Sequence, residues 1–197
     1  MSVAANAPVA VAAPITATAT GGGLLNAVIG AEAVTIAGSP IIKWASPAAS
    51  TYGIPLGKNQ LDAATTVPGK FVYTPAAGKV LASGAQTLSV TFTPIDEADF
   101  ATVMAKVTLR VNPALLTATA KNVTVAYNKP LPKLTYTVAG FVNHETSAVL
   151  HGWAVETTTA KQGSPAGTYP IKLAIGTLKA SNYKFAFKNG LLTITPP

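Results

Sequence analysis

The stretch Tyr52-Gly53-Ile54-Pro55-Leu56 returns later in the chain as Tyr127-Asn128-Lys129-Pro130-Leu131. Farther along, a second pair of matching elements occurs, Asp99-Phe100 and then Asn182-Tyr183, each an acidic or amide residue followed by an aromatic one. A recurrence of this kind is typical of repeated structural units. The sequence therefore predicts two similar modules, preceded by a segment, residues 1–40, that has no second copy.

Both modules show the pattern of short strands separated by turns. Residues 88–92 alternate between apolar and polar, residues 103–111 do the same, and Gly and Pro occur at short intervals. Asn189-Gly190, between two alternating runs, predicts a two-residue hairpin turn. We therefore expect an all-β fold: two tandem antiparallel immunoglobulin-like β-sandwiches, residues 41–113 and 114–197, after an extended apolar arm, residues 1–40.

The positive charge is concentrated in the second module. The whole chain has a formal net charge of +7, and residues 114–197 hold eight lysines against Glu145 and Glu156. This excess favours acidic partners such as acidic polysaccharide or another polyanion, although scattered lysines also serve only to keep a strand-rich protein soluble. The polar positions of alternating strands predict one basic face formed by Lys172, Lys179, Lys184 and Lys188. Phe185 and Phe187, between Lys184 and Lys188, are expected to point to the core side, so no aromatic residue is interleaved on this face and sequence-specific nucleic-acid binding is not expected.

Several classes of protein are disfavoured by what the sequence lacks. The chain has no cysteine, which excludes disulfides, thiolate nucleophiles and cysteine-based zinc sites. No apolar run reaches 18 residues, so no membrane span is expected. Residues 1–6 contain no Lys or Arg, and Pro8 and Pro14 interrupt the apolar stretch that follows, so the sequence predicts no classical signal peptide.

The candidates for chemistry are weak. The turn Asp96-Glu97-Ala98-Asp99 offers oxygens for calcium but lacks the spacing of a calcium loop, which favours a solvated turn. His144, Glu145 and His151 form only a loose trio for a metal. No nucleophile elbow, paired buried carboxylates or phosphate-binding glycine loop occurs. We therefore expect no enzyme activity and no catalytic, cofactor or metal site; a lysine–asparagine isopeptide crosslink stays open.

The segment 1–40 contains a single charged residue, Glu32, which makes it a poor solvated linker. Termini are usually disordered unless something holds them. We therefore expect this arm to dock on a partner subunit through its apolar side chains, Val9, Val11, Ile15, Leu24, Leu25, Val28 and Ile29.

Several stretches resemble known families. Residues 48–56, 67–75 and 87–94 are similar to the bacterial immunoglobulin-like repeats of long surface proteins. Gly140-Phe141-Val142-Asn143, Gly167-Thr168-Tyr169-Pro170-Ile171 and Asn182-Tyr183-Lys184-Phe185 resemble the mostly-bacterial immunoglobulin-like (MBG) domain. The resemblance covers residues 41–197, implies the fold and brings no catalytic residues. The short chain and its own arm, residues 1–40, depart from the long secreted arrays in which the family usually occurs.

Three functions follow as hypotheses. The first is a non-enzymatic structural or attachment subunit of a large self-assembling particle, most specifically a phage virion protein (head decoration or tail) that docks through residues 1–40. The second is a bacterial extracellular adhesin or fibre subunit on the cell surface, in which the arm completes a neighbour's sheet by strand addition. The third is a carbohydrate-binding module, which requires exposed aromatics and has only Trp44 and Trp153 as tryptophans.

Overall fold

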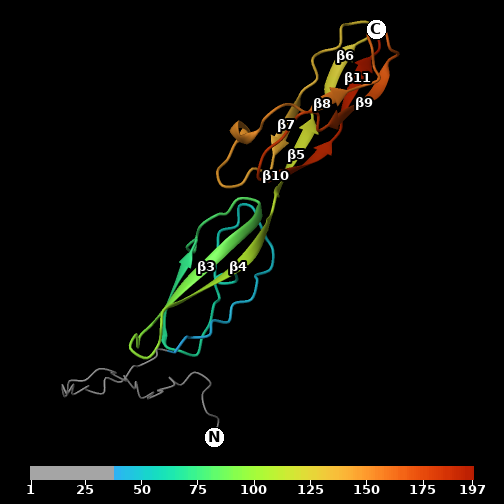
Figure 1. Cartoon of the computed structure of the whole chain (residues 1–197). Coiled ribbons are helices and arrows are strands. Elements are labelled where there is room, and N and C mark those ends of the chain that lie inside the picture. The colour runs from blue at the N-terminus through green and yellow to red at the C-terminus, as the bar shows by residue number, and fades with distance from the viewer. Residues whose placement is uncertain (1–37) are drawn as a thin grey trace, which may run out of the picture. The chain divides into compact units, whose positions relative to one another are not determined.

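The computed structural model of the chain describes residues 38–197, and this part is all-β, as predicted (Figure 1). Besides a single turn of 3₁₀ helix, η1 (Ser147–Val149), its regular elements are strands. The strands are β1 (Ser50–Thr51), β2 (Gly69–Thr74), β3 (Gly84–Pro94), β4 (Val103–Asn112), β5 (Ala114–Ala120), β6 (Val123–Ala126), β7 (Tyr136–Ala139), β8 (Val155–Thr157), β9 (Gly167–Ala174), β10 (Tyr183–Lys188) and β11 (Gly190–Thr195). Within this part no helix is long and apolar enough to cross a membrane.

The described residues divide by their contacts into two compact units. The first comprises residues 38–47, Lys58–Ala77 and Thr87–Val107, and the second comprises Ala48–Gly57, Gly78–Gln86 and Thr108–Pro197. Two short segments that precede residue 113 thus belong to the second unit. The expected modules 41–113 and 114–197, and their arrangement as tandem sandwiches, stay predictions.

A four-stranded sheet has the order β1-β4-β3-β2, and its alternating strand β3 supplies the core of the first unit. Leu88, Val90 and Phe92 lie on its inner face and are at most 1% exposed. On β2, the ring of Phe71 lies 4.8 Å from that of Phe92. Trp44 is half-buried and packs edge-on against Tyr73, with 5.5 Å between the ring centroids. The predicted period-two pattern of β3 is confirmed.

The second unit contains two sheets that share one core. A three-stranded sheet has the order β10-β5-β7, and a four-stranded sheet has the order β6-β11-β9-β8. Ala118 of β5 packs in one buried cluster with Ile171 of β9 and Leu192 of β11, and all three are fully buried. Strong burial of these apolar side chains is the main stabilising contribution to such a small unit.

The sheets are mixed, which differs from the predicted antiparallel pairing. Three strand pairs run parallel: β1 with β4, β10 with β5, and β11 with β6. The strands of each parallel pair are separated by long stretches of chain, which is the spacing that parallel neighbours require. An alternating pattern defines the buried face of a strand but not its neighbour, so the sequence could not distinguish the two directions.

The predicted hairpin at Asn189-Gly190 is wrong. Strand β10 pairs with β5, whereas β11 pairs with β9 and β6, so the chain passes from one sheet to the other at this point. The side-chain Oδ1 of Asn189 accepts a hydrogen bond from the backbone N–H of Leu173 at 3.1 Å. A Cβ at Gly190 would lie 2.8 Å from the carbonyl oxygen of Ala120, so the crossing requires glycine. The turn-forming residues serve a sheet-to-sheet crossing instead of a hairpin.

The apolar residues assigned to the docking arm, Val9 to Ile29, lie outside the described residues. Of the predicted arm, residues 38–40 are described. Gly38 forms an isolated parallel bridge with Phe100, and its N–H donates to the carbonyl oxygen of Asp99 at 2.7 Å. Docking of the arm on a partner stays a prediction.

Candidate functional site

A single carboxylate of the second unit binds two tyrosine hydroxyls. The hydroxyl of Tyr52 donates to Oε1 of Glu145 at 2.8 Å, and the hydroxyl of Tyr183 donates to Oε2 of the same side chain. The two phenol rings meet edge to face with centroids 5.5 Å apart, and each tyrosine is only 8% exposed. Edge-to-face contacts between aromatic rings are favourable, so the rings and the carboxylate support one another.

The loop that presents Glu145 is a tight turn. Asn143 and His144 both have positive φ angles, 57° and 58°, and the N–H of Glu145 donates to the carbonyl oxygen of Val142 at 3.0 Å. Two successive left-handed residues between such partners define a type I′ turn, a conformation that asparagine and histidine tolerate better than most residues. Directly before the turn, the N–H of Val142 donates to the hydroxyl of Tyr183 at 3.1 Å. The turn and the tyrosine therefore hold each other in place.

The tyrosine hydroxyl at the centre stays protonated. Burial, and then the hydrogen bond to Glu145, raise the pKa of Tyr183 from 10.0 to about 12. Both causes disfavour the phenolate, since the apolar surroundings and the adjacent carboxylate oppose a second negative charge. A tyrosine that acts as a general base needs a lowered pKa. Tyr183 is therefore a hydrogen-bond donor to the carboxylate and is not poised for proton abstraction.

The same site holds two segments that lie far away in the sequence. A Cβ at Gly53, which has a φ of 98°, would lie 2.7 Å from Cγ2 of Val142, so the turn after Tyr52 lies directly against the loop. In the segment 78–86, the N–H of Ser83 donates to Oδ1 of Asn182 at 3.0 Å. These contacts explain why the segments 48–57 and 78–86 belong to the second unit.

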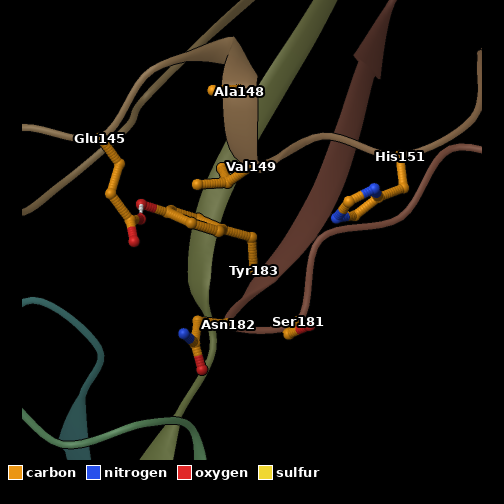
Figure 2. Close-up of a pocket in the computed structure, with 7 residues that line it drawn as sticks. All are labelled: Glu145, Ala148, Val149, His151, Ser181, Asn182 and Tyr183. Atoms are coloured by element: carbon orange, nitrogen blue, oxygen red, sulfur yellow. Dashed lines mark hydrogen bonds between the residues drawn. The ribbon is translucent and has the colours of Figure 1, made fainter.

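A hollow of about 340 Å³ lies beside this cluster (Figure 2). Figure 2 shows the carboxylate of Glu145 next to the hydroxyl of Tyr183, with His151 at the other end of the tyrosine. The hollow is lined by Glu145, Ala148, Val149, His151, Ser181, Asn182 and Tyr183. Its carboxylate is already bound by two hydroxyls and its asparagine by Ser83. The polar groups thus serve to join segments of the chain.

Part of this site, including Glu145 and Tyr183, lies in a stretch that matches a known family model. Residues 116–193 match the family model of the MBG domain (YGX type). The resemblance predicted from the sequence is confirmed for this part of the chain, and the similarity of residues 41–113 to bacterial immunoglobulin-like repeats stays a prediction. The MBG domain is a structural immunoglobulin-like domain of bacterial extracellular and surface proteins, and it is not known as an enzyme family. No curated protein matches the chain.

The four lysines predicted to form one basic face are all exposed but do not share a sheet. Lys172 lies on β9 of the four-stranded sheet, whereas Lys184 and Lys188 lie on β10 of the three-stranded sheet. Lys179 forms an isolated bridge with His151. The four lysines therefore do not lie on the face of a single sheet, and a basic surface that they share stays a prediction. Contact of individual lysines with a polyanion stays a prediction.

The two candidate metal sites have other roles. In the turn 96–99, Oδ1 of Asp96 accepts from the N–H groups of Ala98 and Asp99 at 3.2 and 3.1 Å, which is the local bonding of a solvated turn. Glu145 is bound by tyrosines, and His144 and His151 are exposed. Across residues 38–197, no group of three or more histidine or acidic side chains is placed to hold a metal ion.

A second hollow, of about 500 Å³, is bordered by Trp153, which is 75% exposed. Its other lining residues include Tyr136, whose hydroxyl accepts the N–H of Ala154 at 3.1 Å, and the charged Lys133 and Glu156. A carbohydrate-binding face needs several exposed aromatics to stack on sugar rings. A single exposed tryptophan gives little support to that hypothesis.

The convergence of Tyr52, Glu145 and Tyr183 was not predicted from the sequence. The repeat marks the elements that contain the two tyrosines, whereas the sequence around Glu145 indicates only a loose trio with the two histidines. A signal was present: Glu145 is one of only two acidic residues in the strongly basic stretch 114–197. In the structure this acid pairs with two tyrosine hydroxyls.

Proposed function

We propose that this chain is a non-enzymatic structural segment of a bacterial surface protein, such as an adhesin or a fibre, in which it spaces and attaches other parts. The observation that carries the proposal is the cluster of Tyr52, Glu145 and Tyr183. Its polar groups are bonded to one another, and the pKa of Tyr183 is raised, so they hold segments together instead of facing a substrate. The MBG match supports the extracellular setting.

The partners under this proposal are other proteins of a large assembly, and acidic polysaccharide of the cell envelope is a further candidate for the exposed lysines. These lysines are all exposed and lie on more than one sheet. Binding of a polyanion to them would be weak and strongly salt-dependent. We expect the protein contacts to determine where the chain resides.

The phage virion protein, as head decoration or tail component, is the alternative. It rests on docking by residues 1–40, of which the structure describes only 38–40. It shares with the surface fibre the same non-enzymatic, structural character. The two hypotheses differ in the particle with which the chain is recovered.

Fractionation of the native source on a density gradient, followed by peptide mass spectrometry of each fraction, tests the proposal. We expect peptides of this chain in the cell envelope or in extracellular fibres, and their release by protease added to intact cells. A cytosolic enzyme and an outer-surface protein serve as markers. Recovery with DNA-containing particles would favour the virion instead, and recovery with the cytosolic marker would contradict both.

A further inference from the structure

The two turns that carry the repeated sequence are structural copies of one another. The N–H of Tyr52 donates at 2.8 Å to the carbonyl oxygen of Asn112, the last residue of β4. In the same way, the N–H of Tyr127 donates at 3.0 Å to the carbonyl oxygen of Thr195, the last residue of β11. In each case the short strand before the tyrosine pairs in parallel with the strand that supplies this carbonyl.

The match continues through the turn itself. The residue after each tyrosine has a positive φ, 98° at Gly53 and 61° at Asn128. The following residue then closes the turn with its N–H. The N–H of Ile54 donates to the carbonyl oxygen of Thr51 at 3.1 Å, and the N–H of Lys129 donates to the carbonyl oxygen of Ala126 at 3.2 Å. The two tyrosines are therefore presented by the same backbone geometry.

Only one of the two tyrosine side chains is covered. Tyr52 is 8% exposed because Glu145, Tyr183 and the loop that holds them cover it, whereas Tyr127 is 40% exposed. Within residues 38–197 the Tyr127 side chain has no hydrogen bond and no ring contact. The chain thus presents the same docking element twice and covers it once.

We propose that the turn Tyr127–Leu131 is a docking site for a further MBG domain, which would cover Tyr127 as Glu145 and Tyr183 cover Tyr52. The partner must offer a carboxylate and a tyrosine equivalent to Glu145 and Tyr183. The exposed Lys129, at the position of Ile54, favours an acidic loop on the partner. The proposal goes beyond the proposed function, since it holds wherever the chain resides.

The structure also defines which MBG domain fits. At Gly53 a Cβ would lie 2.7 Å from Cγ2 and 2.9 Å from Cβ of Val142, so glycine is needed on one side of this contact. In the second turn the equivalent residue is Asn128, which has a Cβ and would clash with a valine at the position of Val142. The partner of Tyr127 therefore has glycine where this chain has Val142, and an unchanged copy of residues 114–197 fits poorly.

A fusion protein tests the proposal directly. In the fusion, residues 1–196 are followed by a second copy of residues 114–197. The junction is placed there because Thr195-Pro196 is equivalent to Asn112-Pro113, which precedes Ala114 in the chain. The appended copy carries Val142→Gly, to remove the clash, and Tyr127→Phe, so that only the original Tyr127 is mapped. Nitration by tetranitromethane, located by peptide mass spectrometry, reports the exposure of that tyrosine.

Tethering keeps the appended domain at high effective concentration, so we expect it to cover Tyr127. Nitration of Tyr127 should then slow by about fivefold, the ratio of its 40% exposed fraction to the 8% of the covered Tyr52. The matched control adds Glu145→Gln and Tyr183→Phe to the appended copy, and nitration should return to the rate of the unextended chain. Unchanged nitration beside a protease-resistant appended copy would overturn the proposal.

A second experiment covers a fusion that fails to fold. In the unextended chain, Tyr52→Ala with Val142→Gly opens the Glu145–Tyr183 pair to the Tyr127 of another molecule. Such head-to-tail contacts do not close on themselves, so sedimentation should reveal concentration-dependent oligomers. Adding Tyr127→Ala should restore the monomer. Chains that stay monomeric at millimolar concentration, with Tyr127 intact, would contradict the proposal.

Discussion

Replacing Tyr183 by phenylalanine removes one hydroxyl and keeps the ring that packs against Tyr52 and Phe141. The hydroxyl donates to Glu145 and accepts the N–H of Val142 at 3.1 Å. A hydrogen bond to a charged group contributes about 1.5–3 kcal/mol, and a backbone N–H left without a partner costs about 1 kcal/mol more. Because Glu145 is half-buried and water replaces part of the loss, we expect Tyr183→Phe to lower the free energy of unfolding by about 2–3 kcal/mol.

Urea denaturation followed by circular dichroism measures this loss, and Tyr127→Phe is the matched control. The control removes a hydroxyl that has no partner in the described part of the chain, so its effect should stay within about 0.5 kcal/mol. Combining Tyr183→Phe with Tyr52→Phe should give less than the sum of the single losses, because both hydroxyls bind the carboxylate of Glu145. A loss for Tyr183→Phe no larger than that of the control would refute the stabilising role of the hydrogen bond between Tyr183 and Glu145.

Three further predictions concern the same unit. The pKa of Tyr183 is 10.0 in the unfolded chain and about 12 in the folded protein, so its contribution to the free energy of unfolding is complete below pH 10 and is lost as the pH rises through 12. Urea denaturation over this pH range should show the fall in the wild type and not in Tyr183→Phe. Gly53→Ala should destabilise more than Gly78→Ala in thermal melts, since both have positive φ but only Gly53 lies against Val142; equal losses would contradict the close contact. Asn189→Ala should cost about 1–2 kcal/mol by urea denaturation, because a backbone N–H of β9 loses its acceptor, and a neutral result would argue against the crossing.

The strand pattern could be predicted from the sequence, but the pairing could not. Alternation in β3 correctly placed Leu88, Val90 and Phe92 in the core, because the side-chain period of a strand is a local property. The partner of β10 is β5, far earlier in the chain, and no local pattern contains that information. At Asn189 the local signal favoured a hairpin, whereas tertiary packing used the same residue to cross between sheets.

The candidate site was harder to predict for the same reason. Glu145 is 93 residues from Tyr52 and 38 residues from Tyr183, so the three become neighbours only when β10 takes its place beside β5. The repeat identified both tyrosine elements as important but did not relate them to each other. The alternation of lysines likewise could not assign β9 and β10 to different sheets.

The parallel pairing of β6 with β11 has a mechanical consequence. Strand β6 continues from β5, where the MBG domain begins, and β11 is its final strand. Tension applied through the two ends would pull these strands in opposite directions along their length. The pairs from Leu192↔Val123 to Thr195↔Ala126 would then carry the load together, instead of opening one after another as in a peeled hairpin. A domain joined in this way resists stretching until the whole ladder breaks at once.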